Sequence, residues 1–372
     1  MDMFLPSVPV LAQAFGAAPG TAQHAVTTYL LGLAVGQLSW GPLSDRYGRK
    51  PVLLAGLGLF LAATAFAAAA DSMVEVVLLR FAQGAGMSSG PVIARSIVRD
   101  LYARDQAAHL LARMMAVFGI IPVAAPLVGG QAIALGGWQA VFLVYAAIAL
   151  LLLAAVGFGL RETAPATRPS LAAARVAANF GMLIRDPRFR ASLVTMLLAQ
   201  MGIIAFVSGS SLAMVKALQL SPTAFSLLFA AVMLGQITGG FIGSRLVIRL
   251  GIRRMVRLGS ALALAGGLLL AAFALAGTAH WAAVVLPMIV YLFGCSFIIP
   301  SATAAALAPF PQMAGAASSL LGALPFALGA AVSAGLAWGF DGTVRPMALA
   351  VATFGCAAFL AEWLYFRKML HG

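Results

Sequence analysis

The chain has 372 residues, of which 62 % are hydrophobic and 9 % are charged, and its formal net charge is +13. A soluble domain carries about 25 % charged and about 45–50 % apolar residues, so this composition excludes a water-soluble globule, a disordered protein and a disulfide scaffold. The basic residues fall in short clusters between long uncharged runs, which argues against nucleic acid as a partner.

Apolar runs of about 20 residues, the length that crosses a bilayer as a helix, recur along the whole chain. The segment 281–340 holds 60 residues without a charged side chain, so it must contain two spans, with a break predicted at 309–312. We therefore predict an all-α polytopic membrane protein with eleven full spans, at 24–43, 51–70, 73–98, 110–134, 138–160, 191–215, 221–244, 258–279, twice within 281–340, and at 346–366.

Residues 1–11 are all that is left for a span before the first of these. They would form about 16 Å of helix, whereas the hydrocarbon core of a bilayer is about 30 Å thick. The sequence therefore predicts a truncated first helix, that is, eleven full spans plus a remnant.

Lysine and arginine are distributed unevenly between the two sets of span ends. Twenty stand at one set of ends and only Lys216 and Arg345 at the other. Because basic loops stay on the cytoplasmic side, this predicts a cytoplasmic central loop and C-terminus. The predicted domains are an N-terminal helical bundle at 1–160, a cytoplasmic linker at 161–190 and a C-terminal bundle at 191–372.

The two halves of the chain resemble each other at a nearly constant offset. The segment 36–46 is similar to 235–245, an offset of 199, and 119–122 is similar to 322–325, an offset of 203. Both pairs keep the same direction across the membrane. They predict a parallel duplication of six spans plus six about a pseudo-two-fold axis along the membrane normal.

The most specific local feature is the turn 41–50, with the sequence G-P-L-S-D-R-Y-G-R-K. Its Gly48 permits a left-handed backbone, and its Asp45 stands among cations, where it can pair with a neighbour or a helix N-terminus. With the offset of 199, Ser244 takes the place of Asp45 in the second half, so a charged latch would be lopsided. The candidate cytoplasmic gate residues are Gly41, Asp45, Arg46, Gly48, Arg49 and Lys50.

Two further charges are predicted inside the membrane, where each costs about 2.5–3.5 kcal/mol or more and is usually functional. Arg80 lies within the span 73–98, and Glu75, five residues earlier, is turned off its helix face. Asp2 would lie deep in a complete first span, where a buried carboxylate can exchange protons near neutral pH. Arg80 and Asp2 are therefore candidates for proton or substrate coupling.

These segments together resemble the major facilitator superfamily. The turn 41–50 looks like its cytoplasmic-loop signature, and 79–86 is similar to its R-x-x-Q-G motif. The segments 2–6 and 95–100 look like the Bcr/CflA branch, the bicyclomycin and chloramphenicol resistance type. The segment 119–130 resembles the antiporter motif, with matches at Gly119, Pro122, Pro126, Gly129 and Gly130.

The resemblance implies two six-helix bundles that rock about a central site. It implies a proton-coupled efflux pump of the bacterial inner membrane that expels drugs or small metabolites. It assigns coupling to Asp2 and Arg80 and the locking of one gate state to Asp45. We expect no enzyme activity, no metal and no cofactor, with the proton gradient driving a monomer in the lipid bilayer. Two alternatives remain open: a facilitator or symporter for a sugar, organic acid or amino acid, and an inactive N-terminally truncated product.

Overall fold

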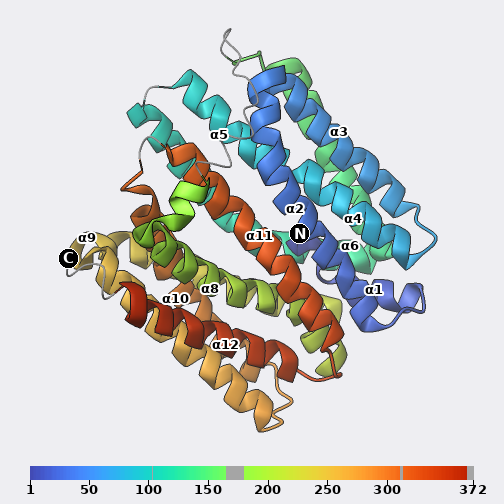
Figure 1. The fold of residues 1–372 in the computed structure, drawn as a ribbon. Helices are drawn as coiled ribbons and strands as arrows, with labels where there is room; N and C mark the ends of the chain where they lie inside the picture. Colours follow the sequence, from blue (N-terminus) through green and yellow to red (C-terminus); the bar gives the residue numbers. More distant parts are fainter. Residues whose placement is uncertain (103, 165–179, 311–312, 367–372) are drawn as a thin grey trace. The chain divides into compact units, whose positions relative to one another are not determined.

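The computed structural model describes residues 1–102, 104–164, 180–310 and 313–366, and all regular structure in these ranges is helical (Figure 1). The chain divides into two compact units, Met1–Ala173 and Ala174–Gly372. The division falls inside the predicted linker, of which 165–179 lie outside the described residues. The predicted bounds of the linker and of the two domains therefore stay predictions.

The first unit starts with two short helical segments whose side chains belong to its core. Phe4, Leu5, Val8 and Leu11 are all fully buried. That these segments are the remnant of a longer span stays a prediction. The unit consists of η1 (Asp2–Phe4), α1 (Ser7–Ala14), α2 (Pro19–Tyr47), α3 (Arg49–Ala68), α4 (Met73–Met87), α5 (Ser89–Leu101), α6 (Arg104–Ala154) and η2 (Ala155–Gly159).

The second unit is built from longer helices. It consists of α8 (Pro187–Ser211), η3 (Leu212–Ala217), α9 (Pro222–Leu275), α10 (Ala282–Leu307), α11 (Ala314–Trp338), α12 (Arg345–Ala361) and η5 (Glu362–Phe366). The break predicted at 309–312 falls between α10 and α11, and residues 311–312 lie outside those described.

Seven candidate membrane spans are found among the described residues by length and composition. Two of them carry two predicted spans each, because α6 leaves helical geometry at Gly136 and Gly137, and α9 does so at Gly251. The predicted span 73–98 is divided at Ser88 between α4 and α5. The Ser88 hydroxyl donates to the carbonyl of Ala85 at 2.8 Å, a local bond that bends helices. All eleven predicted spans thus correspond to helices.

Equivalent close helix contacts occur inside each of the two units. A side-chain carbon added to Gly36 on α2 would clash with the hydroxyl of Ser88, and one added to Gly239 on α9 would clash with the hydroxyl of Ser296. Gly48 and Gly251 both have positive φ, at 103° and 75°. The members of each glycine pair lie 203 positions apart, as do Gly32 and Gly235, and Gly56 and Gly259.

The offset of 199 predicted for 36–46 is therefore wrong, because Gly36 corresponds to Gly239. The sequence comparison slipped by four residues since glycine recurs every four residues in this part of α9. With the offset of 203, Ile248 and not Ser244 takes the place of Asp45. The second half still has no acid at this position, so the expected asymmetry remains.

Candidate functional site

The first polar centre, which we call the Arg80 site, consists of Phe4, Tyr29, Thr64, Arg80 and Gln83 within the first unit. Arg80 is fully buried, at 0 % exposure. The central carbon of its guanidinium lies 4.1 Å from the ring centroid of Phe4 and 4.0 Å from that of Tyr29. A desolvated cation over an aromatic face gains about 2 kcal/mol. Two aromatic faces therefore offset part of the burial cost of this charge.

A chain of hydrogen bonds runs from Arg80 on α4 to α3. Nη1 of Arg80 donates to Oε1 of Gln83 at 2.7 Å, and Nε2 of Gln83 donates to Oγ1 of Thr64 at 2.7 Å. The Thr64 hydroxyl donates in turn to the carbonyl of Phe60 at 2.6 Å. Gln83 is thus held from both sides, which fixes the direction of its carbonyl toward the guanidinium. On the α2 side, Nε of Arg80 reaches the carbonyl of Ala25 at 3.4 Å.

One guanidinium nitrogen of the Arg80 site is left over. Nη2 of Arg80 is buried and has no hydrogen-bond partner among the described residues. A buried unpaired donor costs about 1–3 kcal/mol, and more when it is charged. The Arg80 site therefore has unused capacity for an oxygen acceptor such as water, a carboxylate or a substrate oxygen.

Asp2 and Arg80 are not joined by an ion pair in the described part of the chain. Asp2 begins η1, the 3-10 helix whose Phe4 covers the guanidinium. Its coupling role stays a prediction. Glu75 lies apart from Arg80, as expected, and accepts a hydrogen bond from the backbone N–H of Asp71 at 3.0 Å.

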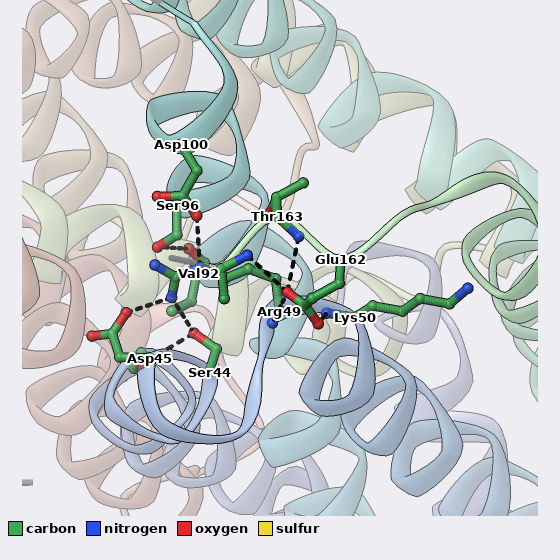
Figure 2. A network of polar contacts seen from close by, with 11 residues as sticks. Ser44, Asp45, Arg49, Lys50, Val92, Ser96, Asp100, Glu162 and Thr163 are labelled. Atoms are coloured by element: carbon green, nitrogen blue, oxygen red, sulfur yellow. Dashed lines mark hydrogen bonds and ion pairs between the residues drawn. The ribbon is translucent and has the colours of Figure 1, made fainter. Parts of the chain in front are cut away.

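The second centre, which we call the Arg49 cluster, consists of Ser44, Asp45, Arg49, Asp100 and Glu162 (Figure 2). The Arg49 side chain is 7 % exposed, and its Nε donates to Oδ2 of Asp100 at 2.8 Å. Its Nη1 donates to Oγ of Ser44 at 2.8 Å and also to Oδ1 of Asp45. One cation at the start of α3 thus holds carboxylates from the ends of α2 and α5.

The turn that carries Arg49 depends on Gly48, which has φ 103° and ψ 154°. This backbone region is essentially restricted to glycine. The Glu162 carboxylate accepts the backbone N–H groups of Arg49 at 2.8 Å and Lys50 at 3.2 Å. Partial burial opposes ionisation of Glu162, but its backbone N–H donors outweigh that effect and lower the pKa of the carboxyl.

Four of the six predicted gate residues are not members of the Arg49 cluster: Gly48 and Lys50 flank Arg49 in the chain, and the other two are Gly41 and Arg46. A side-chain carbon added to Gly41 would lie 3.8 Å from Cγ1 of Val92, an ordinary contact, so local packing does not require glycine there. Arg46 is exposed, with its guanidinium 5.5 Å from the ring centroid of Tyr47.

The antiporter motif lies within α6, and Gly129 shows what it does for packing. A side-chain carbon added to Gly129 would clash with the backbone carbonyl of Met3. This glycine therefore lets α6 approach the 3-10 helix that covers Arg80. Backbone dihedrals stay helical at both prolines, and the kink of α6 lies further on, at Gly136 and Gly137. The other motif residues within α6 are Gly119, Pro122, Pro126 and Gly130.

Among the described residues of the second unit, an apolar side chain takes the place of the buried cation. Gly86 on α4 and Gly294 on α10 each lie against the equivalent glycine of the preceding long helix, Gly56 or Gly259. Gly86 and Gly294 are 208 positions apart, and the same offset places the fully buried Met288 where Arg80 stands.

Several members of the two centres were not among the predicted site residues. Gln83 had a usable signal, because it follows Arg80 by three positions and so shares its helix face. Asp100 lay in a segment quoted only for its resemblance to the Bcr/CflA branch. Phe4 and Ser44 also lay in quoted segments, 2–6 and 41–50, whereas Tyr29, Thr64 and Glu162 carry no local signal that singles them out.

Two units of apolar helices with matching close contacts, the first of which holds a buried cation, are typical of a multi-pass membrane transporter. The family model of the Major Facilitator Superfamily matches residues 1–334, and the chain belongs to this superfamily. Its members are transporters of small molecules, so this protein is not an enzyme.

The relatives include drug-resistance proteins of bacteria. A bicyclomycin resistance protein homolog of Haemophilus influenzae is 30 % identical over 371 residues, covering 98 % of this chain and 91 % of that protein. Multidrug resistance protein D of Escherichia coli is 31 % identical over 325 residues, covering 87 % of this chain and 80 % of that protein. The predicted family and its bicyclomycin-resistance branch are confirmed.

A solved structure of a D-xylose-proton symporter has the same fold. Its TM-score is 0.76 at 17 % sequence identity, and the match covers 98 % of this chain and 93 % of that chain. This likeness concerns the fold alone, and it confirms the predicted major facilitator architecture.

The Thr64 hydroxyl gives a first test of the Arg80 site. We expect Thr64→Val to lower the transport rate about fivefold, because Nε2 of Gln83 loses its acceptor at a cost of about 1 kcal/mol. Thr195→Val is the matched control, since Thr195 is equally buried and donates to the carbonyl of Ala191 in the same way. Uptake into proteoliposomes measures the rates. An equal loss of transport rate in both variants would contradict a role for the hydrogen-bond chain from Thr64 through Gln83 to Arg80.

Proposed function

We propose that this protein is a proton-coupled exporter of the bacterial inner membrane that exchanges protons for drug-like or small-metabolite substrates by alternating access. It works as a monomer in the lipid bilayer, without a cofactor, and the proton gradient drives it. The observation that carries this proposal is Arg80, a fully buried cation with one unused N–H donor group. Charges buried in membrane helices are expensive and are retained where they line a transport or proton path.

The Arg80 site supplies a fixed positive charge beside η1. A positive charge favours the ionised form of any carboxylate that approaches it and disfavours a bound cation. Proton release from a nearby carboxylate, for which Asp2 on the same 3-10 helix is the candidate, would therefore depend on its distance from Arg80. This dependence is the physical basis for exchanging protons against substrate.

The substrate class follows from the scarcity of embedded charges and from the relatives. A mostly apolar site suits amphipathic molecules that are neutral or cationic. The relatives described above are named for resistance to bicyclomycin and to multiple drugs, which supports export of such compounds.

The Arg49 cluster is the proposed latch of the gate at the cytoplasmic ends of the helices. Its ion pairs join the ends of α2, α3 and α5 in one conformation, and breaking them would release these ends. The excess of lysine and arginine at this set of ends supports placing the cluster, the central loop and the C-terminus in the cytoplasm.

Purified protein in proteoliposomes tests the proposal directly. With chloramphenicol or ethidium as the probe and an imposed pH gradient, we expect substrate and protons to move in opposite directions, with protons followed by a pH dye inside the vesicles. Collapsing the gradient with an ionophore should stop accumulation. Movement of substrate and protons in the same direction would instead establish a symporter, and transport that ignores the gradient would refute proton coupling.

A further inference from the structure

Glu162 occupies an unusual position, because it lies beyond the last helical segment of the first unit yet contacts the start of α3. Its Oε1 accepts hydrogen bonds from the backbone N–H groups of Arg49 at 2.8 Å, Thr163 at 2.9 Å and Ala164 at 2.9 Å. Its Oε2 accepts from the N–H of Lys50 at 3.2 Å. One carboxylate thus joins its own turn to the start of α3, where Arg49 and Lys50 lie 113 and 112 positions earlier in the sequence.

A second bond joins the same two segments in the opposite direction. Nζ of Lys50 donates to the carbonyl of Gly157 in η2 at 2.7 Å. The first turn of α3 and the end of η2 are therefore held by a carboxylate on one side and by an ammonium on the other. Figure 2 shows Glu162 beside Arg49 and Lys50, on the side of Arg49 away from Asp45.

Gly48 leaves the space that this contact needs. A side-chain carbon at this position would lie 2.6 Å from Oε2 of Glu162. The glycine of the turn therefore has two separate requirements, a backbone conformation with φ 103° and room for the carboxylate. In the second unit, Gly251 has a similar conformation, with φ 75° and ψ 164°, but a side-chain carbon there would meet nothing within 4 Å.

We propose that Glu162 is a positioning residue of the gate, which holds the turn at Gly48 so that the Arg49 side chain reaches Asp45 and Asp100. The inference rests on the proposed function of the Arg49 cluster as a latch. Arg49 is fixed at both ends, with its backbone N–H on Glu162 and its guanidinium on the two aspartates.

Glu162 acts in this proposal as a permanent charge and not as a proton carrier. Its folded pKa is lowered, so its contribution is present above the ordinary value of 4.5 and is lost only as the pH falls through the lower folded value. Between about pH 6 and pH 8 it stays ionised. Replacing it should therefore change the rate of transport without changing the shape of the pH profile.

The first experiment uses Glu162→Gln, with Glu75→Gln as the control. Glu75 also accepts a backbone N–H near a helix start, at Asp71, but lies outside the cluster. We expect Glu162→Gln to lower kcat about five- to tenfold with KM changed less than about twofold, because positioning and not substrate contact is lost. Amide exchange of residues 49–53 should rise in this variant and stay unchanged in the control.

The second experiment is a double-mutant cycle read by the same amide exchange. Gly48→Ala places a carbon against the Glu162 carboxylate, and Glu162→Ala removes that carboxylate. Both break the same contact, so amide exchange in the double variant should be no faster than in Gly48→Ala. Gly251→Ala is the matched control, and its effect on this amide exchange should be independent of that of Glu162→Ala. Independent effects of Gly48→Ala and Glu162→Ala would overturn the proposal.

The two proposals fail in distinguishable ways. If wild-type protein moves no protons against substrate, the proposed function fails, while amide exchange still reports whether Glu162 holds the turn. If wild type transports as proposed and Glu162→Gln matches it in kcat and amide exchange, the positioning role of Glu162 is refuted and the proposed function stands.

Discussion

Arg80→Met should abolish gradient-driven transport and leave the protein as stable as the wild type. The second unit shows that methionine fits this position, since Met288 is fully buried at the place equivalent to Arg80. Replacing a buried charge by an apolar side chain of similar volume is often neutral or stabilising. We expect the transport rate to fall at least about 100-fold, because the charge on which the proposed proton coupling depends is gone.

The measurement pairs transport in proteoliposomes with thermal unfolding in detergent. The unfolding temperature of Arg80→Met should stay within about 3 °C of the wild type. Arg80→Lys keeps the charge but loses the flat stacking on Phe4 and Tyr29, so we expect an intermediate loss of about tenfold. Arg254→Met removes an exposed cation and should transport normally. Transport by Arg80→Met within twofold of wild type would refute the role of Arg80.

The spans were predictable because local hydrophobic composition indicates which segments cross the membrane. An apolar run of about 20 residues has few alternatives to a spanning helix. The division at Ser88 was not predicted, although the run Ser88-Ser89-Gly90-Pro91 is a turn signal and Pro91 has no N–H to donate along the helix. The repeat was found with the wrong register, because glycine at spacing four makes a slip of four residues nearly invisible until the neighbouring helices are seen.

The members of the two centres were predictable only where they lie together in one sequence segment or stand out by their charge. Asp45, Gly48 and Arg49 stand within a single turn, and Arg80 is conspicuous as a charge in an apolar run. Phe4 and Tyr29 come from other segments, and a sequence gives no register between helices.

Glu162 was the hardest member to foresee, because it contacts Arg49 across 113 positions. In the sequence it is one acid in a stretch dominated by arginine. The proposed role of Glu162 depends on the turn at Gly48 lying close to η2, and only the folded structure shows that these two segments are neighbours.

Removing the cation of the Arg49 cluster should stop the proposed gate and also destabilise the first unit. Arg49→Met leaves the carboxylates of Asp45 and Asp100, 45 % and 15 % exposed, without their shared partner. We expect the unfolding temperature to fall by about 5 °C, a modest shift because solvent screens the more exposed carboxylate. The transport rate should fall at least about 20-fold, since the guanidinium that bonds both Asp45 on α2 and Asp100 on α5 is gone. Arg254→Met again serves as the control.

A neutral triple variant separates the stability of the cluster from its action as a latch. Asp45→Asn, Arg49→Met and Asp100→Asn together leave no unpaired charge, so most of the lost unfolding temperature should return. Transport should stay low, because a latch needs an attraction that forms in one conformation and is absent in the other. Recovery of transport together with stability would show that the cluster only stabilises the fold. Recovery of stability alone is the result expected for a gate that is held by charge.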